Sequence, residues 1–330
     1  MSVKHLFGCI ALAAALAGAA WLCIHRQGGG GRAGAAVEDA KAAPRPLPAT
    51  GVAVRAVPPS ALGARPTSDR LPPVVPSSKD VAAVTDAASG SLDARLAALA
   101  GHGKSLQEVD VDALLSFLDR RDAEDALPPE KLNALKNDVA NLLRAQIRFP
   151  DVLPWRLAAM WRDPLHDVVW RDYCIQHAGA AWPRIANKAA RDEVRALLWS
   201  AAADPAAPGS GTSLIALRNL AESGAEERKK VAALAAATAE SGSAPEGVRV
   251  TALQIAAELG APGAASLARP ILSDRSQPVH LRMSAAAALG MAGDASDLPA
   301  LKALAATSDP RLRAAASSAL RRLGEIPEKQ

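Results

Sequence analysis

The last third of this sequence repeats itself, and this self-similarity limits the possible folds more than any other feature. Three segments carry a hydrophobic residue followed by an arginine, and each reaches a glycine 11 residues after that arginine. Successive arginines are separated by 33 and 31 residues. The equivalent positions are Arg249, Arg282 and Arg313, and Gly260, Gly293 and Gly324. A period of this length is typical of helix-pair units that bury their apolar faces only against the next unit.

Each unit also carries signals for the ends of its helices. Glycine readily adopts the left-handed conformation that ends many helices, so the three repeat glycines are predicted C-caps. Asp309 is a predicted N-cap, and Pro310 follows at the first helical position, where proline is favoured. A looser fourth copy begins near Thr212 and closes at Gly224. The sequence therefore predicts helical repeats over residues 211–324.

The segment from Ser308 to Gly324 resembles a HEAT repeat. It opens with Asp-Pro, continues with a Leu-Arg pair and closes on Leu-Gly, which is the pattern of the first helix in this family, particularly in its short bacterial, PBS-lyase-like type. The resemblance covers residues 211–324. It implies an α-α superhelix, a HEAT/armadillo-like solenoid, with a concave surface used mostly for binding proteins. Some relatives bind nucleic acid and some attach bilin chromophores to proteins, so the resemblance does not imply a single activity.

The composition agrees with an all-α fold. The chain is 49% hydrophobic but only 3% aromatic. Alanine and leucine dominate, and both favour helices, whereas strands are rich in β-branched and aromatic residues. Upstream of the repeats, apolar residues such as Leu143 and Ile147 recur at helical spacing. We therefore expect an irregular helical domain at residues 91–203, the repeats at 211–324 and a short tail at 325–330.

The N-terminus of the chain is apolar. An uncharged run of 19 residues extends from Leu6 to Ile24. Its length lies between the roughly 7–15 residues of a signal-peptide core and the roughly 20 residues of a spanning helix. Small residues before Trp21 offer a cleavage site, whereas Trp21 itself suits an uncleaved anchor at the membrane interface. Residues 1–26 are therefore predicted to be a signal peptide or a membrane anchor, with the body of the protein outside the cytoplasm.

Residues 27–90 are predicted to form a linker. A glycine run covers Gly28–Gly31, and nine of the 24 prolines fall between Pro44 and Pro76. Proline is excluded from helix interiors, and no helical period of apolar residues survives in this range. We predict a disordered, partly polyproline-II tether that precedes the helical body.

Residues 155–182 concentrate the aromatic side chains of an otherwise aromatic-poor chain. Tryptophan, tyrosine and arginine dominate the energetically important positions of protein interfaces. The sequence therefore predicts a partner-binding patch here, with the alternative that these side chains fill the core where the irregular helices meet the repeats. The candidate patch comprises Trp155, Trp161, Trp170, Arg171, Tyr173, His177 and Trp182.

Helical spacing assigns two further roles within this segment. Leu165, Val169 and Tyr173 are spaced four residues apart, which predicts core positions on one helix face. Asp167 and Arg171 have the spacing of a helical ion pair, which is ordinary surface chemistry.

Groups suited to catalysis or metal binding are scarce. Cys9 and Cys23 lie in the apolar N-terminus, so Cys174 is the single thiol of the body, which therefore has no internal disulfide. Cys174 and His177 are three residues apart, and such a pair can form a nucleophile, but no oxyanion-hole signal or third orienting group accompanies it. His166 and His177 lack the carboxylate cluster that would complete a metal site. The sequence predicts no catalytic residue, no metal and no cofactor.

The repeat arginines have two candidate roles. In the resembling family such arginines usually bond neighbouring turns and repeats, whereas a basic stripe for phosphate or acidic partners is the alternative. Acidic residues such as Glu246, Glu258 and Asp274 interleave with them, so the structural role is favoured. The predicted structural positions are Arg249, Arg282, Arg313, Gly260, Gly293, Gly324, Asp309 and Pro310.

These observations favour a non-catalytic scaffold that mediates protein–protein interaction with an unknown partner protein. It would be exported or held at a membrane by the N-terminal apolar segment, and neither enzyme activity nor a small-molecule substrate is inferred. One alternative is a HEAT-like lyase, chromophore-attachment or other enzyme-accessory factor, and a second is a nucleic-acid-binding HEAT protein. Nucleic acid is a disfavoured partner, because the formal net charge is only +4 and an exported body does not meet DNA.

Overall fold

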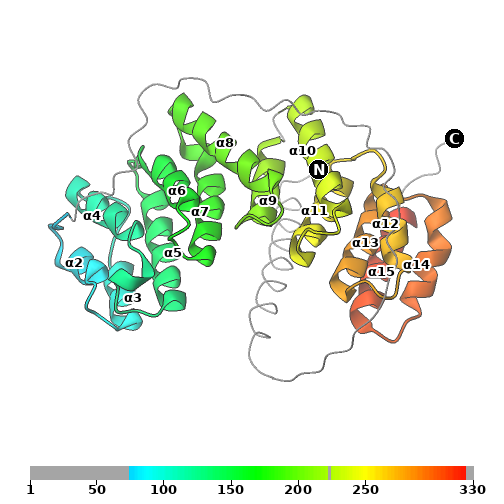
Figure 1. The fold of residues 1–330 in the computed structure, drawn as a ribbon, viewed down its shortest axis with the longest axis horizontal. Helices are drawn as coiled ribbons and strands as arrows, with labels where there is room; N and C mark the ends of the chain where they lie inside the picture. Colours follow the sequence, from blue (N-terminus) through cyan, green and yellow to red (C-terminus); the bar gives the residue numbers. More distant parts are fainter. Residues whose placement is uncertain (1–73, 222–223, 325–330) are drawn as a thin grey trace, which may run out of the picture. The chain divides into compact units, whose positions relative to one another are not determined.

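The computed structural model describes residues 74–221 and 224–324, and its regular elements are all helical (Figure 1). Fourteen α-helices, α2 to α15, and the short 3-10 helices η1, η2 and η4 make up this part of the chain, which contains no strand. The prediction of an all-α fold is thus confirmed for the described residues. The predicted N-terminal apolar helix, residues 27–73 of the predicted linker and the tail at 325–330 lie outside them.

The first group of helices precedes the predicted repeats. Its members are α2 (Lys79–Thr85), α3 (Leu92–Ala100), α4 (Glu108–Leu118), η1 (Asp122–Glu124), α5 (Pro129–Ala145), α6 (Leu153–Arg162), α7 (Val168–Ala181), η2 (Trp182–Arg184) and α8 (Lys188–Ala203). The second group comprises α9 (Ser210–Leu220), α10 (Ala225–Glu240), α11 (Glu246–Glu258), α12 (Ala264–Ser273), α13 (Val279–Ala292), η4 (Ala295–Asp297), α14 (Leu298–Ala305) and α15 (Pro310–Gly324).

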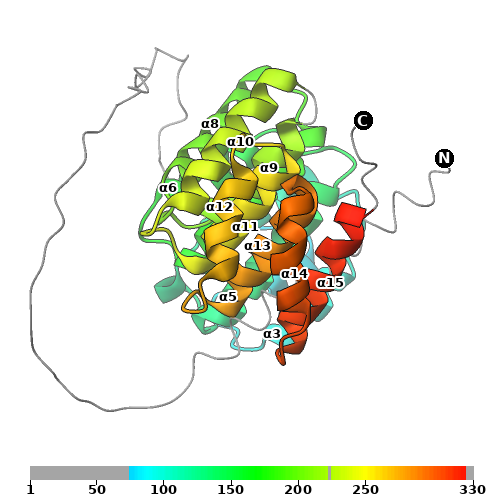
Figure 2. The same ribbon diagram turned by 90° about the vertical axis from the view of Figure 1, so that its right-hand side faces the viewer.

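The second group stacks as helix pairs in two layers. Helices α9, α11, α13 and α15 form one layer, in which each helix packs against the next. In the other layer α10 packs on α11, α12 on α13, and α14 on α15. Helices α13, α14 and α15 lie together at the C-terminal end of the described residues (Figure 2). A stack of helix pairs in which each pair contacts its neighbours is the arrangement of an α-solenoid.

Packing continues upstream of the predicted repeats without a break. Helix α9 contacts α7 and α8, α7 contacts α5 and α6, and α5 contacts α3 and α4. The buried apolar side chains form one cluster that runs from Val81 in α2 to Ala319 in α15. The irregular helices and the repeats therefore share a single hydrophobic core.

Two glycines set how closely neighbouring helices approach. A Cβ atom on Gly290 of α13 would lie 2.8 Å from the Cα and 3.0 Å from the Cβ of Ala319 in α15. A Cβ atom on Gly179 of α7 would lie 2.7 Å from the Cβ of Ala216 in α9. Non-bonded carbon atoms prefer separations of about 3.5–4.0 Å. A side chain at either glycine would therefore push its helix away from the next one in the layer.

The Gly290→Ala variant should be less stable than wild type by about 1–3 kcal/mol, because the added methyl group forces α13 and α15 apart. Gly247 in α11 offers a matched control, since nothing lies within 4 Å of the position its Cβ would occupy. Gly247→Ala should be stabilising by about 0.5 kcal/mol, because alanine has the higher helix propensity. Chemical denaturation of the full chain measures both free energies of unfolding. Equal losses in the two variants would contradict the close packing at Gly290.

The helical body begins earlier than the sequence predicted. Helix α2 starts after Ser78, whose Oγ accepts hydrogen bonds from the backbone N–H groups of Asp80 and Val81. The buried carboxylate of Asp110 in α4 accepts bonds from the N–H groups of Ser77 and Ser78, at 2.8 and 3.0 Å, and from Ser77 Oγ at 2.9 Å. The predicted linker through residue 90 is therefore corrected for residues 74–90, because contacts with a distant helix, not a local pattern, hold this segment.

The repeat glycines end their helices in different ways. Gly260 has the expected left-handed conformation, with a φ of 71°. Gly293 follows α13 in an extended conformation, with φ −80° and ψ −177°, and a Cβ there would lie 2.5 Å from the carbonyl oxygen of Leu289. Gly324 is the last residue of α15 and is not among the described glycines with positive φ. The expectation of left-handed C-caps is thus corrected at Gly293, where crowding by the preceding turn favours glycine, and at Gly324.

The start of α15 has the capping arrangement expected from the sequence. Asp309 Oδ1 accepts hydrogen bonds from the backbone N–H groups of Arg311 at 2.8 Å and Leu312 at 3.3 Å. Pro310 is the first residue of the helix. The bond from the Arg311 N–H holds the pKa of the Asp309 carboxyl below its usual value, so the cap is charged at neutral pH.

Two apolar residues that the sequence assigned to helix faces are exposed instead. Ile147 is 73% exposed, because α5 ends at Ala145 and the residue projects from the loop that follows. Leu165 is 63% exposed, because α7 begins only at Val168 and helical spacing does not apply before it. Across residues 74–221 and 224–324, no helix combines the length and the apolar character needed to cross a bilayer.

Candidate functional site

The aromatic-rich segment covers α6, α7 and η2, and most of it faces inward. Trp161, Trp170 and His177 are buried. Trp155, Arg171, Tyr173 and Trp182 are half-buried. A partner cannot reach the three buried side chains without opening the fold, so the predicted patch does not form one continuous surface.

Trp161 joins the segment to the loop between α8 and α9. Its Nε1 donates a hydrogen bond to the carbonyl oxygen of Pro208 at 2.9 Å. Arg171 lies above the indole, with its guanidinium carbon 6.0 Å from the ring centroid, and its Nε donates to the carbonyl oxygen of Trp161 at 2.7 Å. The Trp161 indole N–H and the Arg171 Nε–H thus both donate to carbonyl oxygens of the same chain, as expected for side chains that pack within the fold.

The ion pair predicted between Asp167 and Arg171 is replaced by a helix cap. Asp167 Oδ1 accepts bonds from the backbone N–H groups of Val169 at 2.8 Å and Trp170 at 3.3 Å, and from Asn133 Nδ2 at 2.6 Å. Asp167 is the N-cap of α7, so its carboxylate points back to the helix start rather than forward to Arg171.

Trp170 lies at the centre of a buried polar cluster. Its side chain is fully buried, Lys136 Nζ of α5 lies 5.2 Å from its ring centroid, and the His177 ring lies 6.4 Å away. Lys136 donates a hydrogen bond to the carbonyl oxygen of Arg120. Burial lowers the pKa of Lys136 to about 8, because the protonated amine loses hydration that one carbonyl and an aromatic face replace only in part. This cluster ties α5 to α7 and has no access to solvent.

Cys174 and His177 do not form an activated pair. Burial raises the pKa of the Cys174 thiol, so the nucleophilic thiolate is disfavoured. Burial, and then the nearby charge of Arg144, lower the pKa of His177 to about 3. Neither ring nitrogen of His177 has a hydrogen-bond partner among the described residues. In the same residues no group of three or more His, Cys, Asp or Glu side chains is arranged to hold a metal ion.

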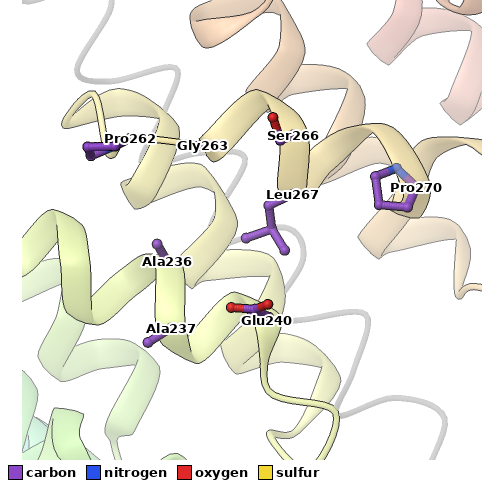
Figure 3. A pocket seen from close by; sticks show the side chains of 8 residues that line it. All are labelled: Ala236, Ala237, Glu240, Pro262, Gly263, Ser266, Leu267 and Pro270. Atoms are coloured by element: carbon purple, nitrogen blue, oxygen red, sulfur yellow. The ribbon is translucent and has the colours of Figure 1, made fainter. Parts of the chain in front are cut away.

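An open groove of about 490 Å³ lies between α10 and α12. Figure 3 shows Ala236 of α10 and Leu267 of α12 facing the gap between the two helices. Its lining residues are Ala236, Ala237, Glu240, Pro262, Gly263, Ser266, Leu267 and Pro270. Glu240 is the one ionisable side chain of this lining, so the groove offers a surface for contact but no acid–base pair.

A second groove, of about 230 Å³, lies beside Trp182. Gly179, Ala180, Trp182 and Pro183 line one side, at the end of α7 and in η2, and Asn219 and Leu220 at the end of α9 line the other. Two arginines of α8 lie over the Trp182 ring, with guanidinium carbons 5.7 Å (Arg191) and 5.2 Å (Arg195) from its centroid. Trp182 is therefore the member of the predicted patch that meets both a groove and two surface cations.

Comparison with known proteins agrees with this architecture. The family model of HEAT repeats matches residues 231–321. Residues 231–321 are HEAT repeats. No curated protein matches the chain. The solved structure of human deoxyhypusine hydroxylase in complex with glycerol has 17% sequence identity and a TM-score of 0.32, over 75% of this chain and 95% of that one, which is too remote to bear on activity.

Two of the three repeat arginines, Arg249 and Arg282, make the same contact. Arg249 Nε in α11 donates to the carbonyl oxygen of Ala239 in α10 at 3.3 Å, and Arg282 Nε in α13 donates to that of Leu272 in α12 at 3.2 Å. Each arginine thus satisfies a carbonyl in the last turn of the helix before it. Arg313 is exposed, and no bond from its side chain is found among the described residues.

The same contact occurs upstream of the matched residues. Arg171 in α7 bonds the carbonyl oxygen of Trp161 in α6, again ten residues earlier. Arg171 also lies four residues after its N-cap, Asp167, as Arg313 lies four after Asp309. The α6–α7 pair therefore has the same arginine contact as the α10–α11 and α12–α13 pairs. A signal was present in the sequence, since Asp167, Trp170 and Arg171 have the spacing of Asp309, Leu312 and Arg313.

Proposed function

We propose that this chain is a non-catalytic HEAT-repeat scaffold that holds another protein, and that residues 1–26 export it or anchor it at a membrane. The stacked helix pairs carry this proposal. HEAT repeats generally mediate protein interaction, and the two grooves present small apolar side chains of the kind that a partner can cover.

The chemistry of the described side chains supports the non-catalytic part of the proposal. A nucleophile acts as a thiolate or with an adjacent base, and it must be reached by its substrate. Cys174 is fully buried, its pKa is raised, and His177 beside it on α7 has no exposed surface. A chromophore-attachment role that used this thiol would first require α7 to leave the core.

The membrane part of the proposal is supported by the 19 uncharged residues from Leu6 to Ile24. N-terminal sequencing of the mature protein together with membrane fractionation tests it. An anchor leaves Met1 and the uncharged run in the mature chain, and a signal peptide leaves a start near Trp21. A full-length protein that fractionates without membrane and is not exported would contradict both.

Site-specific photo-crosslinking in native cells tests the scaffold itself. A photoreactive amino acid replaces exposed alanines of the grooves and the terminal repeat, at Ala180, Ala237 and Ala314, with Ala94 in α3 as the control outside them. We expect discrete protein adducts at one or more of the first three positions, and these should persist in a Cys174→Ala background. If none of Ala180, Ala237 and Ala314 gave a discrete adduct, the scaffold function would be contradicted.

A further inference from the structure

The groove beside Trp182 has the size and lining of a site for one apolar side chain. Pockets that hold drug-sized ligands or cofactors have volumes of about 300–1,000 Å³. The groove of about 230 Å³ is smaller, and it is lined mainly by apolar residues of α7, η2 and α9. Trp182 is half-buried, and its indole supplies a flat apolar wall of the groove.

Positive charge lies beside this groove, because the guanidinium groups of Arg191 and Arg195 are placed over the Trp182 ring. Arg191 is exposed, and its Nε donates to the carbonyl oxygen of Ile185 at 2.6 Å, which leaves its terminal nitrogens without a partner among the described residues. The Arg195 side chain is 49% exposed and lies 3.8 Å from Asp192, which also accepts from Lys188 at 2.5 Å. One carboxylate is thus shared by two cations, while both guanidinium groups over Trp182 retain free donors.

The acidic residue that follows Asp192 in α8 is paired elsewhere, so it does not balance these charges. Glu193 is the next acidic side chain of α8, and it pairs with Arg162 of α6 at 2.5 Å. The first turns of α8 also bear the positive end of the helix dipole. The surface around Trp182 is therefore net positive.

We infer that the groove beside Trp182 binds an acidic segment of a partner protein, which inserts one apolar side chain against the indole and places carboxylates on Arg191 and Arg195. This inference rests on the proposed scaffold function and names the chemistry of its partner. Tryptophan and arginine are the residue types most enriched at interface hot spots, and guanidinium groups bind carboxylates in bidentate geometry. The larger groove between α10 and α12 lacks both features, since its one charged group is the carboxylate of Glu240.

Fluorescence anisotropy with short labelled peptides tests this chemistry on the full chain at low ionic strength, where surface charges are least screened. One peptide set places Leu, Phe or Trp between Asp and Glu residues. A second set replaces every Asp and Glu by Asn and Gln, and a third keeps the acids but replaces the apolar residue by Gly. We expect binding of the first set and at least about tenfold weaker binding of the other two.

Variants locate the binding on the surface. Arg191→Glu with Arg195→Glu should weaken binding of the acidic peptides at least about tenfold, whereas Arg313→Glu with Arg321→Glu, the same charge change on exposed positions of α15, should leave it unchanged. Ala180→Arg adds a cation but fills the groove, so it should also weaken binding. Circular dichroism verifies that each variant remains folded.

Several outcomes would overturn the inference. One is that acidic and neutral peptides bind with equal affinity. A second is that the double variants at Arg191/Arg195 and at Arg313/Arg321 weaken binding equally. A third is that no acidic peptide binds. Crosslinked adducts at Ala237 or Ala314 with none at Ala180 would reject this groove and leave the scaffold standing. A different result would reject the scaffold role instead. In that result acidic peptides bind and depend on Trp182, Arg191 and Arg195, but no crosslinked adduct forms in cells at any position.

Discussion

Replacing Asp125 with alanine should lower the free energy of unfolding by about 3–5 kcal/mol, because it leaves buried guanidinium charge without a counterion. The Asp125 side chain is fully buried. It accepts hydrogen bonds from Arg95 at 2.7 and 3.1 Å and from Arg120 at 2.7 Å. Arg95 is only 1% exposed, so it cannot recover hydration when the carboxylate is removed.

The surroundings of Asp125 show that it is charged in the folded protein. Burial alone would raise the pKa of its carboxyl, but the bonds from Arg95, from the backbone N–H of Leu127 and from Arg120 outweigh burial and hold the pKa below its usual value. The two arginines also lie over the ring of Phe117, at 5.2 and 5.1 Å from its centroid. Loss of the carboxylate therefore disturbs α3, α4 and the loop before α5 together.

Urea denaturation of the full chain measures the loss, with Asp192→Ala as the matched control. Asp192 pairs with Lys188, whose side chain is 89% exposed, and such surface pairs contribute less than about 1 kcal/mol. A loss at Asp125 no larger than the loss at Asp192 would show that the buried arginines are hydrated or paired in another way.

Acid should destabilise this protein through His177, by about 3 kcal/mol between pH 7 and pH 4.5. Burial lowers the pKa of the folded-state ring from 6.5 to about 3, with a further contribution from Arg144. Between these two values the unfolded chain binds the proton and the folded chain does not. The stability that neutral His177 contributes is therefore complete above pH 6.5 and is lost progressively as the pH falls toward 3.

Comparison with a His177→Leu variant separates this effect from the titration of carboxylates. The variant keeps an apolar side chain against Trp170 but has no group to protonate, so the difference in unfolding free energy between wild type and variant should change by about 3 kcal/mol over this pH range. Thermal or urea denaturation at several pH values measures it. Parallel pH profiles of the two proteins would mean that the ring is protonated, or solvated, in the fold.

Local sequence signals predicted the helix pairs and several of their ends. Local sequence is enough to predict the cap at Asp309 and Pro310 and the left-handed Gly260, because each depends only on residues within one helical turn. The structural role assigned to Arg249 and Arg282 also agrees with the observed bonds to Ala239 and Leu272, because a fixed period places each arginine beside the preceding helix.

The sequence predicts the exact ends of helices less well. A misplaced helix end also misplaces the side chains that are expected to be buried on that helix. The spacing of Leu165 predicts a buried helix face, but α7 starts three residues later and the side chain is exposed. The repeat pattern predicts a left-handed Gly293, yet Gly293 is extended at the end of α13 and is crowded by the carbonyl oxygen of Leu289. Both differences arise from backbone geometry that side-chain spacing does not record.

For the candidate site, too, the sequence predicts one part and the tertiary structure decides the other. Composition singled out residues 155–182 but could not tell a binding surface from a core, because both use tryptophan and arginine. The structure buries Trp161 and Trp170 and leaves Trp182 beside a groove. Their partners lie far away in the sequence: Trp161 bonds Pro208, and the groove at Trp182 is completed by Leu220.

The sequence by itself determined that this chain forms stacked helix pairs, since a periodic apolar pattern with caps has few other ways to bury its surface. Only the tertiary structure decided which aromatic side chains are accessible, which charges are buried in pairs, and that Ser77 and Ser78 are held by Asp110. The physical reason is that burial of a side chain is a property of the helices packed around it. Those helices are brought together by the fold and are not its neighbours in the sequence.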